Sequence, residues 1–234
     1  MPELEMFPDR LLGGWFSMSN AADSVDMALA LVSDVSRSVD DGEFALERSG
    51  YADAFTNSTV IQAIRGGPIG AVAVTYIEFA GDDQVQTVLG RTIIRDSSSA
   101  SAFASSLEEA PRSFYGRTAI SAGIDHAVKA LATSGLDTAR GVIDVCGDGT
   151  NNAGREIAEA RDDAVKSGIV INGLAIINEH PVTWAYAHVQ PPGSLTNYYR
   201  ENVIGGAGSF VLEVRDFRSF GEAITRKLIS EIAS

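Results

Sequence analysis

The sequence predicts an α/β protein with a doubly wound, mostly parallel β-sheet, helices on both faces and one antiparallel edge strand. Short apolar runs alternate along the chain with amphipathic segments, as strands and helices do. Several of these runs are apolar at every position, which is typical of strands covered by helices on both faces. In such sheets ligands bind beyond the carboxyl ends of the strands, so the residues that follow each strand are candidates for a functional site.

Five elements are predicted in the first half of the chain. In order, they are a strand over 27–32, a helix over 41–65, a strand over 69–79, an edge strand over 84–94 and a helix over 97–109. The first helix carries an apolar face and ends at Gly66-Gly67-Pro68. Gly81-Asp82-Asp83 predicts the turn of a hairpin, because the segment after it alternates polar and apolar residues. Asp96 precedes a serine-rich helix start and is the expected N-cap.

The second half continues the alternation. In order, we predict a helix over 118–133, a strand over 141–146, a helix over 153–167, a strand over 169–177, an irregular stretch over 179–205, a short strand over 209–214 and a C-terminal helix. That last helix carries a stripe formed by Phe217, Phe220, Ile224 and Leu228. The helices and strands from residue 24 to 234 are expected to form one domain, preceded by an N-terminal arm or degraded signal region over 1–23.

Composition limits the function classes. The net charge of −13 argues against nucleic acid or an anionic membrane surface as the main partner. No apolar stretch approaches the ~18–20 residues that span a bilayer, so no integral membrane segment is expected. Cys146 is the single cysteine; it cannot form an intrachain disulfide and is expected to be a small core residue. The oligomeric state is left open.

The strongest candidate site begins directly after the first predicted strand. Asp34, Ser36 and Ser38 form a D-x-S-x-S cluster of hard oxygen donors, which magnesium prefers. Two later segments add donors of the same kind, Thr118 in Gly116-Arg117-Thr118 and Asp148 in Cys146-Gly147-Asp148-Gly149. Asp34 and Asp148 both follow strands, and so we expect them at one edge of the sheet. Mn²⁺ and Ca²⁺ remain alternatives to Mg²⁺.

This arrangement resembles the von Willebrand factor A (vWA) superfamily, over roughly residues 24–232. The run over 146–154 is similar to that of an uncharacterised bacterial subgroup. The family's metal-ion-dependent adhesion site, or MIDAS, matches Asp34, Ser36, Ser38, Thr118 and Asp148 position by position. The resemblance implies a Mg²⁺ ion that takes a carboxylate from a protein partner as its last ligand. It also implies a periplasmic or secreted bacterial protein, whereas the acidic residues Glu3, Glu5 and Asp9 are unlike the start of an export signal.

Each part of the pattern also has a purely structural interpretation. Asp34 or Ser38 could cap the following helix, Thr118 could cap the middle helix, and Asp148 could be a turn residue. His126, His180 and His188 lack the partners and spacing of a zinc site. The aromatic residues near the irregular stretch, Trp184, Tyr186, Tyr198 and Tyr199, either cover the core or line a partner surface.

Enzyme chemistry finds less support in the sequence. No G-x-S-x-G nucleophile elbow and no G-x-G-x-x-G fingerprint occur. A haloacid-dehalogenase-type phosphatase would carry a second aspartate where Ser36 stands. The prediction is therefore a non-enzymatic, metal-dependent protein-binding module. The alternatives are a metal-assisted phosphoester hydrolase that uses the same ion, with Asp34 as its nucleophile or base, and a structural module whose metal site is silent.

Overall fold

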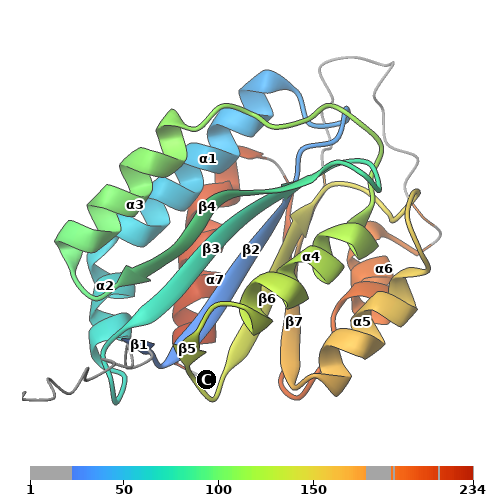
Figure 1. Cartoon of the computed structure of the whole chain (residues 1–234). Coiled ribbons are helices and arrows are strands. Elements are labelled where there is room, and N and C mark those ends of the chain that lie inside the picture. Colours follow the sequence, from blue (N-terminus) through green and yellow to red (C-terminus); the bar gives the residue numbers. More distant parts are fainter. Residues whose placement is uncertain (1–22, 178–190, 192, 216, 234) are drawn as a thin grey trace, which may run out of the picture.

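The computed structural model describes residues 23–177, 191, 193–215 and 217–233, which form a three-layered α/β fold (Figure 1). Six strands form the main sheet in the order β4-β3-β2-β6-β7-β8. They are β2 (Met27–Asp34), β3 (Val72–Phe79), β4 (Val85–Ile94), β6 (Gly141–Gly147), β7 (Ile169–Ile176) and β8 (Val211–Val214). Only the β3–β4 pairing is antiparallel among these strands. The predicted fold class is confirmed.

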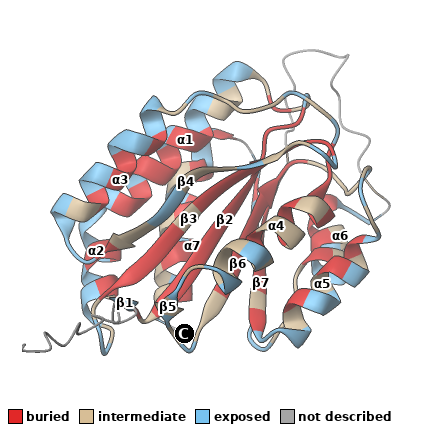
Figure 2. Cartoon of the chain, viewed as in Figure 1, coloured by how far each residue is buried: buried red, intermediate tan, exposed pale blue. Residues whose placement is uncertain are grey.

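Helices cover both faces of the sheet. One layer holds α1 (Asp41–Thr56), α2 (Ser58–Arg65), α3 (Ser97–Glu109) and α7 (Phe220–Ile232), and the other holds α4 (Ile120–Ala132), α5 (Ile157–Lys166) and α6 (Leu195–Tyr198) (Figure 1). Alternate residues of each strand enter different cores: Leu29 and Leu31 pack toward α1 and α7, whereas Ala30 and Val32 pack toward α4. This double burial explains why the strands read as continuous apolar runs, and Figure 2 shows it as buried central strands between half-exposed helices.

Two glycines let helices pack closely. A Cβ on Gly50 of α1 would lie 2.5 Å from the Phe220 ring of α7, and a Cβ on Gly123 of α4 would lie 2.8 Å from Val32 Cγ1 of β2. Both distances are shorter than real Cβ contacts, so larger residues would push α7 off α1 and α4 off the sheet.

The predicted helix over 41–65 is wrong as a single element. Asn57 stops α1 because its backbone is extended, at φ −64° and ψ 129°. The same residue begins α2, since its side chain accepts a hydrogen bond from the Thr59 N–H. The helices predicted over 118–133 and 153–167 begin later, at Ile120 and Ile157.

The last part of the stretch predicted to be irregular is helical. Leu195–Tyr198 forms α6, and Tyr199–Val203 continues it as one turn of π-helix. Leu195, Tyr199 and Val203 are buried at i, i+4 spacing, a helical signal that the prediction missed. Most of residues 179–193 lie outside the described part.

The edge of the fold carries a small element that was not predicted. Strands β1 (Asp23–Ser24) and β5 (Leu136–Asp137) pair in parallel as a separate two-stranded sheet. The arm proposed over 1–23 lies outside the described residues except for Asp23. Within the described part, no helix is both long and apolar enough to cross a membrane.

Candidate metal centre

The D-x-S-x-S cluster leaves β2 and forms a tight loop before α1. The Asp34 carboxylate accepts the Ser36 N–H, with 2.8 Å between Oδ1 and N. This turns the loop so that the hydroxyls of Ser36 and Ser38 lie 3.0 Å apart. Asp34 and Ser36 are almost fully buried. Asp34 therefore shapes the loop that presents the two serines.

The other two predicted residues complete one connected cluster. The Thr118 hydroxyl donates to Ser36 Oγ at 3.2 Å, and the Ser38 hydroxyl donates to Asp148 Oδ1 at 2.9 Å. The contributing loops follow β2, precede α4 and follow β6. All five predicted residues thus meet at one edge of the sheet, as the strand order requires for β2 and its neighbour β6.

Helix capping does not account for these residues. The N-cap of α1 is Asp40, whose carboxylate accepts the Glu43 N–H while Glu43 accepts the Asp40 N–H. That leaves Asp34 and Ser38 outside the cap. At α4, no N-cap side chain bonds the helix start, so Thr118 is not its cap either.

Two asparagines, which were not predicted as site residues, accept backbone N–H groups at the start of α4. Asn152 Oδ1 accepts the Thr118 N–H and Asn151 Oδ1 accepts the Ser121 N–H, each at 3.0 Å. The Tyr198 hydroxyl in turn accepts the Asn151 N–H at 3.0 Å. Consecutive asparagines after a strand-terminal Gly-Asp-Gly were a usable signal, because asparagine side chains readily bond backbone groups. They free the Thr118 hydroxyl to face Ser36.

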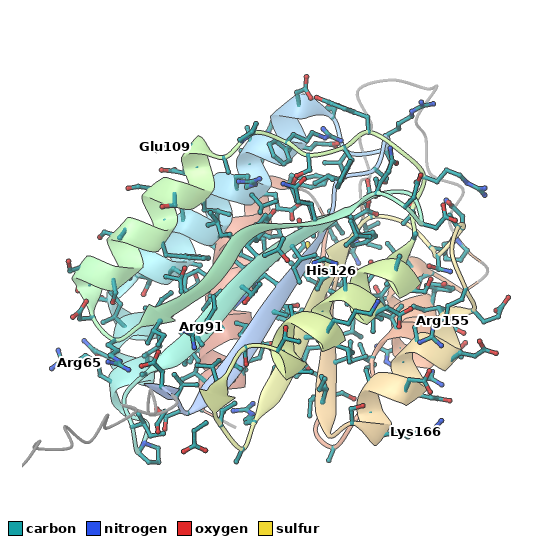
Figure 3. All side chains as sticks on the ribbon, in the orientation of Figure 1. Arg65, Arg91, Glu109, His126, Arg155 and Lys166 are labelled. Carbon is teal, nitrogen blue, oxygen red and sulfur yellow. The ribbon has the colours of Figure 1, made fainter. Side chains whose placement is uncertain are left out.

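Two ion pairs hold the loop after β6. Arg155 binds the Asp125 carboxylate of α4 through two nitrogens, at 2.7 and 2.9 Å, and Asp163 of α5 at 2.9 Å. The Arg155 carbonyl accepts the side-chain amide of Asn151 at 3.1 Å. Figure 3 shows Arg155 beside α4 and α5. The segment that carries Asp148 is thereby fastened to two helices.

Gly147 is required by the close approach of β2 and β6. A Cβ at this position would lie 3.0 Å from Asp34 Cβ and 2.8 Å from the Tyr199 hydroxyl. The glycine before Asp148 therefore makes room for the Asp34 carboxylate. Tyr199 is fully buried behind it, and burial together with Asp34 raises the pKa of its hydroxyl.

A buried carboxyl group lies directly behind the loop. Glu47 of α1 accepts a hydrogen bond from Ser33, the residue before Asp34. Burial raises the pKa of Glu47 to about 8, opposed by the Ser33 bond and assisted by the charges of Asp34 and Glu78. Glu47 is therefore neutral at pH 7 and adds no second negative charge behind Asp34.

The donor set fits a hard divalent cation. Three hydroxyls and two carboxylates lie in one cluster, in which Ser38 is partly exposed and the other four residues are buried, and all are oxygen ligands. Among the described residues, no group of three or more His, Cys, Asp or Glu side chains could hold a metal. Any cation held here would rely on the serine and threonine hydroxyls.

The remaining candidates lie elsewhere. His126 of α4 contacts the Thr87 hydroxyl of β4 at 2.8 Å, and burial lowers its pKa (Figure 3). Cys146 is buried in the sheet, as predicted, and burial raises the pKa of its thiol. His180, His188, Trp184 and Tyr186 fall outside the described residues.

Comparison with known proteins agrees with this architecture. Residues 24–234 match the family described as "Protein of unknown function (DUF1194)". The chain belongs to this family. No curated protein matches the sequence.

Several solved structures share the fold of this DUF1194 protein. Proximal thread matrix protein 1 from the mussel byssus, in a structure with a zinc-occupied MIDAS motif, is 18% identical; the match covers 91% of this chain and 47% of that one, with a TM-score of 0.62. A von Willebrand factor type A structure from Catenulispora acidiphila is 14% identical over 89% of this chain and 43% of that chain, at 0.60. This chain thus spans less than half of either protein.

A smaller neighbour matches almost end to end. It is an aerotolerance-related membrane protein from Bacteroides fragilis NCTC 9343, solved with multiple mutations to serines. It is 21% identical, and the match covers 88% of this chain and 99% of that chain with a TM-score of 0.51. The TM-scores show that this chain shares the vWA fold with these proteins.

Proposed function

We propose that this protein is a non-enzymatic, metal-dependent protein-binding module. Asp34, Ser36, Ser38, Thr118 and Asp148 would hold a Mg²⁺ ion, directly or through water. A carboxylate from a protein partner would complete the coordination. The observation that carries the proposal is the unbroken chain of contacts from Thr118 through Ser36 and Ser38 to Asp148.

The chemistry of the donors favours recognition. Three of the five side chains are neutral hydroxyls, which leave more positive charge on a bound ion than carboxylates would. Such an ion attracts an additional anionic ligand. The buried residues around the cluster keep the hydroxyls in fixed positions, which lowers the ordering cost of binding.

The solved neighbours support the same assignment. The mussel protein carries zinc at a MIDAS motif, and another neighbour is the pilus adhesin SpaC from Lactobacillus rhamnosus GG, 15% identical with a TM-score of 0.58. The match to SpaC covers 89% of this chain and 31% of that chain. A membrane protein is also among the neighbours, which supports our proposal that this protein acts in the periplasm or outside a bacterial cell.

The proposal is tested by capture of partners from an extract of envelope and secreted proteins. Immobilised wild-type protein in Mg²⁺ should retain partners that EDTA releases and that immobilised Asp148→Ala does not retain. Asp137→Ala is the matched control, because Asp137 is a carboxylate in β5, in the separate two-stranded sheet. Equal capture in Mg²⁺ and EDTA would contradict the proposal.

The hydrolase alternative is tested with the same variants. Metal-dependent turnover of p-nitrophenyl phosphate that disappears in Asp34→Asn would replace the binding function by phosphoester hydrolysis. We expect no turnover above that of the free metal ion.

A further inference from the structure

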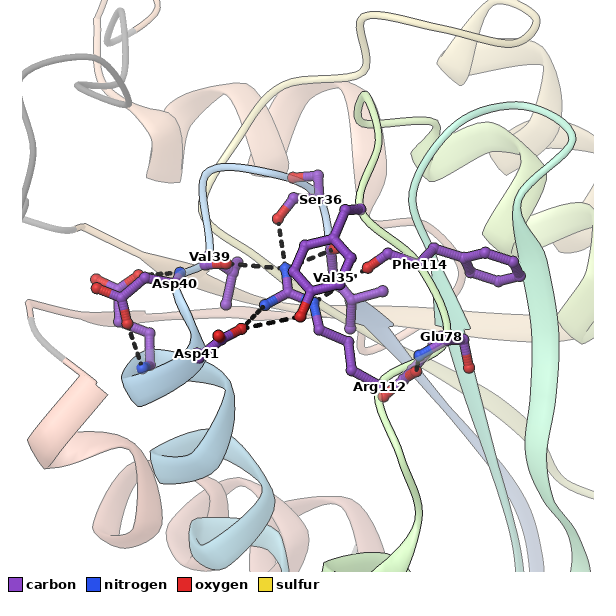
Figure 4. A network of polar contacts seen from close by, with 11 residues as sticks. Val35, Ser36, Val39, Asp40, Asp41, Glu78, Arg112 and Phe114 are labelled. Carbon is purple, nitrogen blue, oxygen red and sulfur yellow. Dashed lines mark hydrogen bonds and ion pairs between the residues drawn. The ribbon is translucent and has the colours of Figure 1, made fainter.

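An arginine outside the predicted site binds the backbone of the metal loop, the loop over 35–39 that carries Ser36 and Ser38. Arg112 lies in the segment between α3 and α4, and only 5% of its side chain is exposed. Its Nη2 atom lies 2.9 Å from the carbonyl oxygen of Val35, 2.9 Å from that of Ser36 and 2.8 Å from that of Val39 (Figure 4). These carbonyls belong to the loop that carries Ser36 and Ser38.

Arg112 donates to all three carbonyls, and the Ser36 carbonyl also accepts the Val39 N–H at 3.1 Å. Val35, Ser36 and Val39 are buried, and a buried carbonyl needs a hydrogen-bond donor. Three carbonyl dipoles that converge on one point also repel one another unless a cation lies between them. The guanidinium supplies both the donors and the permanent positive charge.

Arg112 is itself fixed in position. Its Nε donates to the Phe114 carbonyl at 3.1 Å, and the neighbouring Ser113 N–H donates to the Glu78 carboxylate at 2.8 Å. Glu78 is fully buried and paired with Arg48 at 2.5 Å. The guanidinium also stacks at 4.1 Å on the Tyr115 ring. The arginine is thus anchored to β3 and to its own segment before it reaches the metal loop.

The same contacts join the two halves of the site. The segment that holds Arg112 continues through Gly116 to Thr118, and the Gly116 carbonyl accepts the Arg37 N–H at 3.0 Å. Arg37 lies between Ser36 and Ser38. Arg112 and Gly116 therefore set the distance between the serine loop and the threonine loop.

We infer that Arg112 is the positioning residue of the metal centre, which holds the loop over 35–39 in its ion-binding shape before the ion arrives. This inference rests on the proposed function. Arg112 does not bind the ion. Its role is to order the backbone that presents the Ser36 and Ser38 hydroxyls.

The test compares Mn²⁺ affinity by calorimetry in the wild type, Arg112→Met and Arg112→Lys. Methionine keeps the apolar bulk but removes every donor, and so the dissociation constant should rise by about 10–100-fold, as for other residues that orient metal ligands. Lysine keeps the positive charge without the planar guanidinium, so the dissociation constant of Arg112→Lys should lie between those of the wild type and Arg112→Met. Arg161→Met is the control. Arg161 of α5 also donates to a carbonyl, that of Glu201 at 2.8 Å, but it lies outside the metal loop and the segment that carries Thr118.

A second readout separates positioning from general stability. In the metal-free protein, the amides of Arg37 and Val39 should exchange hydrogen faster in Arg112→Met, while amides in β6 stay protected. Unchanged Mn²⁺ affinity in a folded Arg112→Met would overturn the inference and leave the proposed function standing. A wild type that binds no Mn²⁺ would overturn both. Equal loss of affinity in Arg161→Met would also contradict the inference.

Discussion

Ser38 and Asp148 are 110 positions apart in the sequence, and their side chains lie 2.9 Å apart in the fold. The contact exists because β2 and β6 are parallel neighbours in the sheet, paired from Ala28 with Gly141 to Ser33 with Cys146. Both strands therefore end at the same edge, and the residues that follow them meet. Every prediction on the site depends on this register.

The register at the site depends on Gly147. We predict that Gly147→Ala weakens divalent-ion binding at least about tenfold, because the new methyl group would displace Asp34 and Tyr199. Gly141→Ala in the same strand is the control, since its Cβ would meet Ile169 at 3.5 Å and Leu131 at 3.8 Å, both ordinary contacts. Calorimetric titration with Mn²⁺ measures both. Equal affinities in the two variants would show that the Asp34–Gly147 contact is not needed.

A buried ion cluster between the sheet and α7 fixes the C-terminal helix. Lys227 of α7 lies 2.5 Å from both Asp144 of β6 and Glu231, and all three side chains are fully buried. Lys227→Met should lower the free energy of unfolding by about 3–5 kcal/mol, because two buried carboxylates lose the ammonium group that both contact. Lys166→Met, at an exposed pair with Asp163, should change it by less than about 0.5 kcal/mol.

Urea denaturation at pH 7 measures this difference. A loss below about 1 kcal/mol in Lys227→Met would mean that the carboxylates are protonated or solvated and the cluster contributes little. The cluster also ties α7 to the sheet, so any sliding of this helix would have to break the contact between Lys227 and Asp144.

Glu47 gives the protein a distinct pH dependence. Because its pKa in the folded state is about 8 against 4.5 for an ordinary glutamate, the folded protein binds a proton that the unfolded chain releases between these values. The stabilising contribution of Glu47 is therefore largest below pH 4.5, and it falls as the pH rises toward 8. The charged groups that act on it are Asp34, Glu78 and Arg48.

Glu47→Gln replaces the neutral carboxyl by a neutral amide and should remove this part of the slope. We expect the wild type to lose on the order of 4 kcal/mol more than the variant between pH 4.5 and 8. Denaturant melts of both proteins across this range measure the difference. Parallel pH profiles would contradict the account of Glu47 as a buried neutral acid.

Much of this structure was predictable from local patterns. The central strands β2, β3, β6 and β7 are buried on both faces, so their order in the chain and parallel packing follow from sequence. The hairpin at Gly81 follows from its turn residues, whereas the two-residue strands β1 and β5 left no such signal. The five candidate site residues share an edge because two of them follow strands. Asn57 was missed because it ends one helix and begins the next without a change in apolar pattern.

What could not be predicted depends on contacts between distant segments. Arg112 lies in a segment with no periodic pattern, and its role becomes visible only when the carbonyls of Val35 and Val39 are placed around it. The neutral state of Glu47 likewise depends on burial that the surrounding sequence does not reveal. Thr118 was recognised through a family motif, whereas the asparagines that free its hydroxyl required the fold.

The central claim is that the cluster around Ser36 and Ser38 binds a divalent ion, and a thermal melt of the metal-stripped protein tests it most directly. Titration with Mg²⁺, Mn²⁺ and Ca²⁺ should raise the stability of the wild type saturably, by about 2.7 kcal/mol at one hundred times the dissociation constant. Asp148→Ala should show no such rise, and Asp137→Ala should match the wild type. No rise with any ion, or the same rise in Asp148→Ala, would contradict the claim.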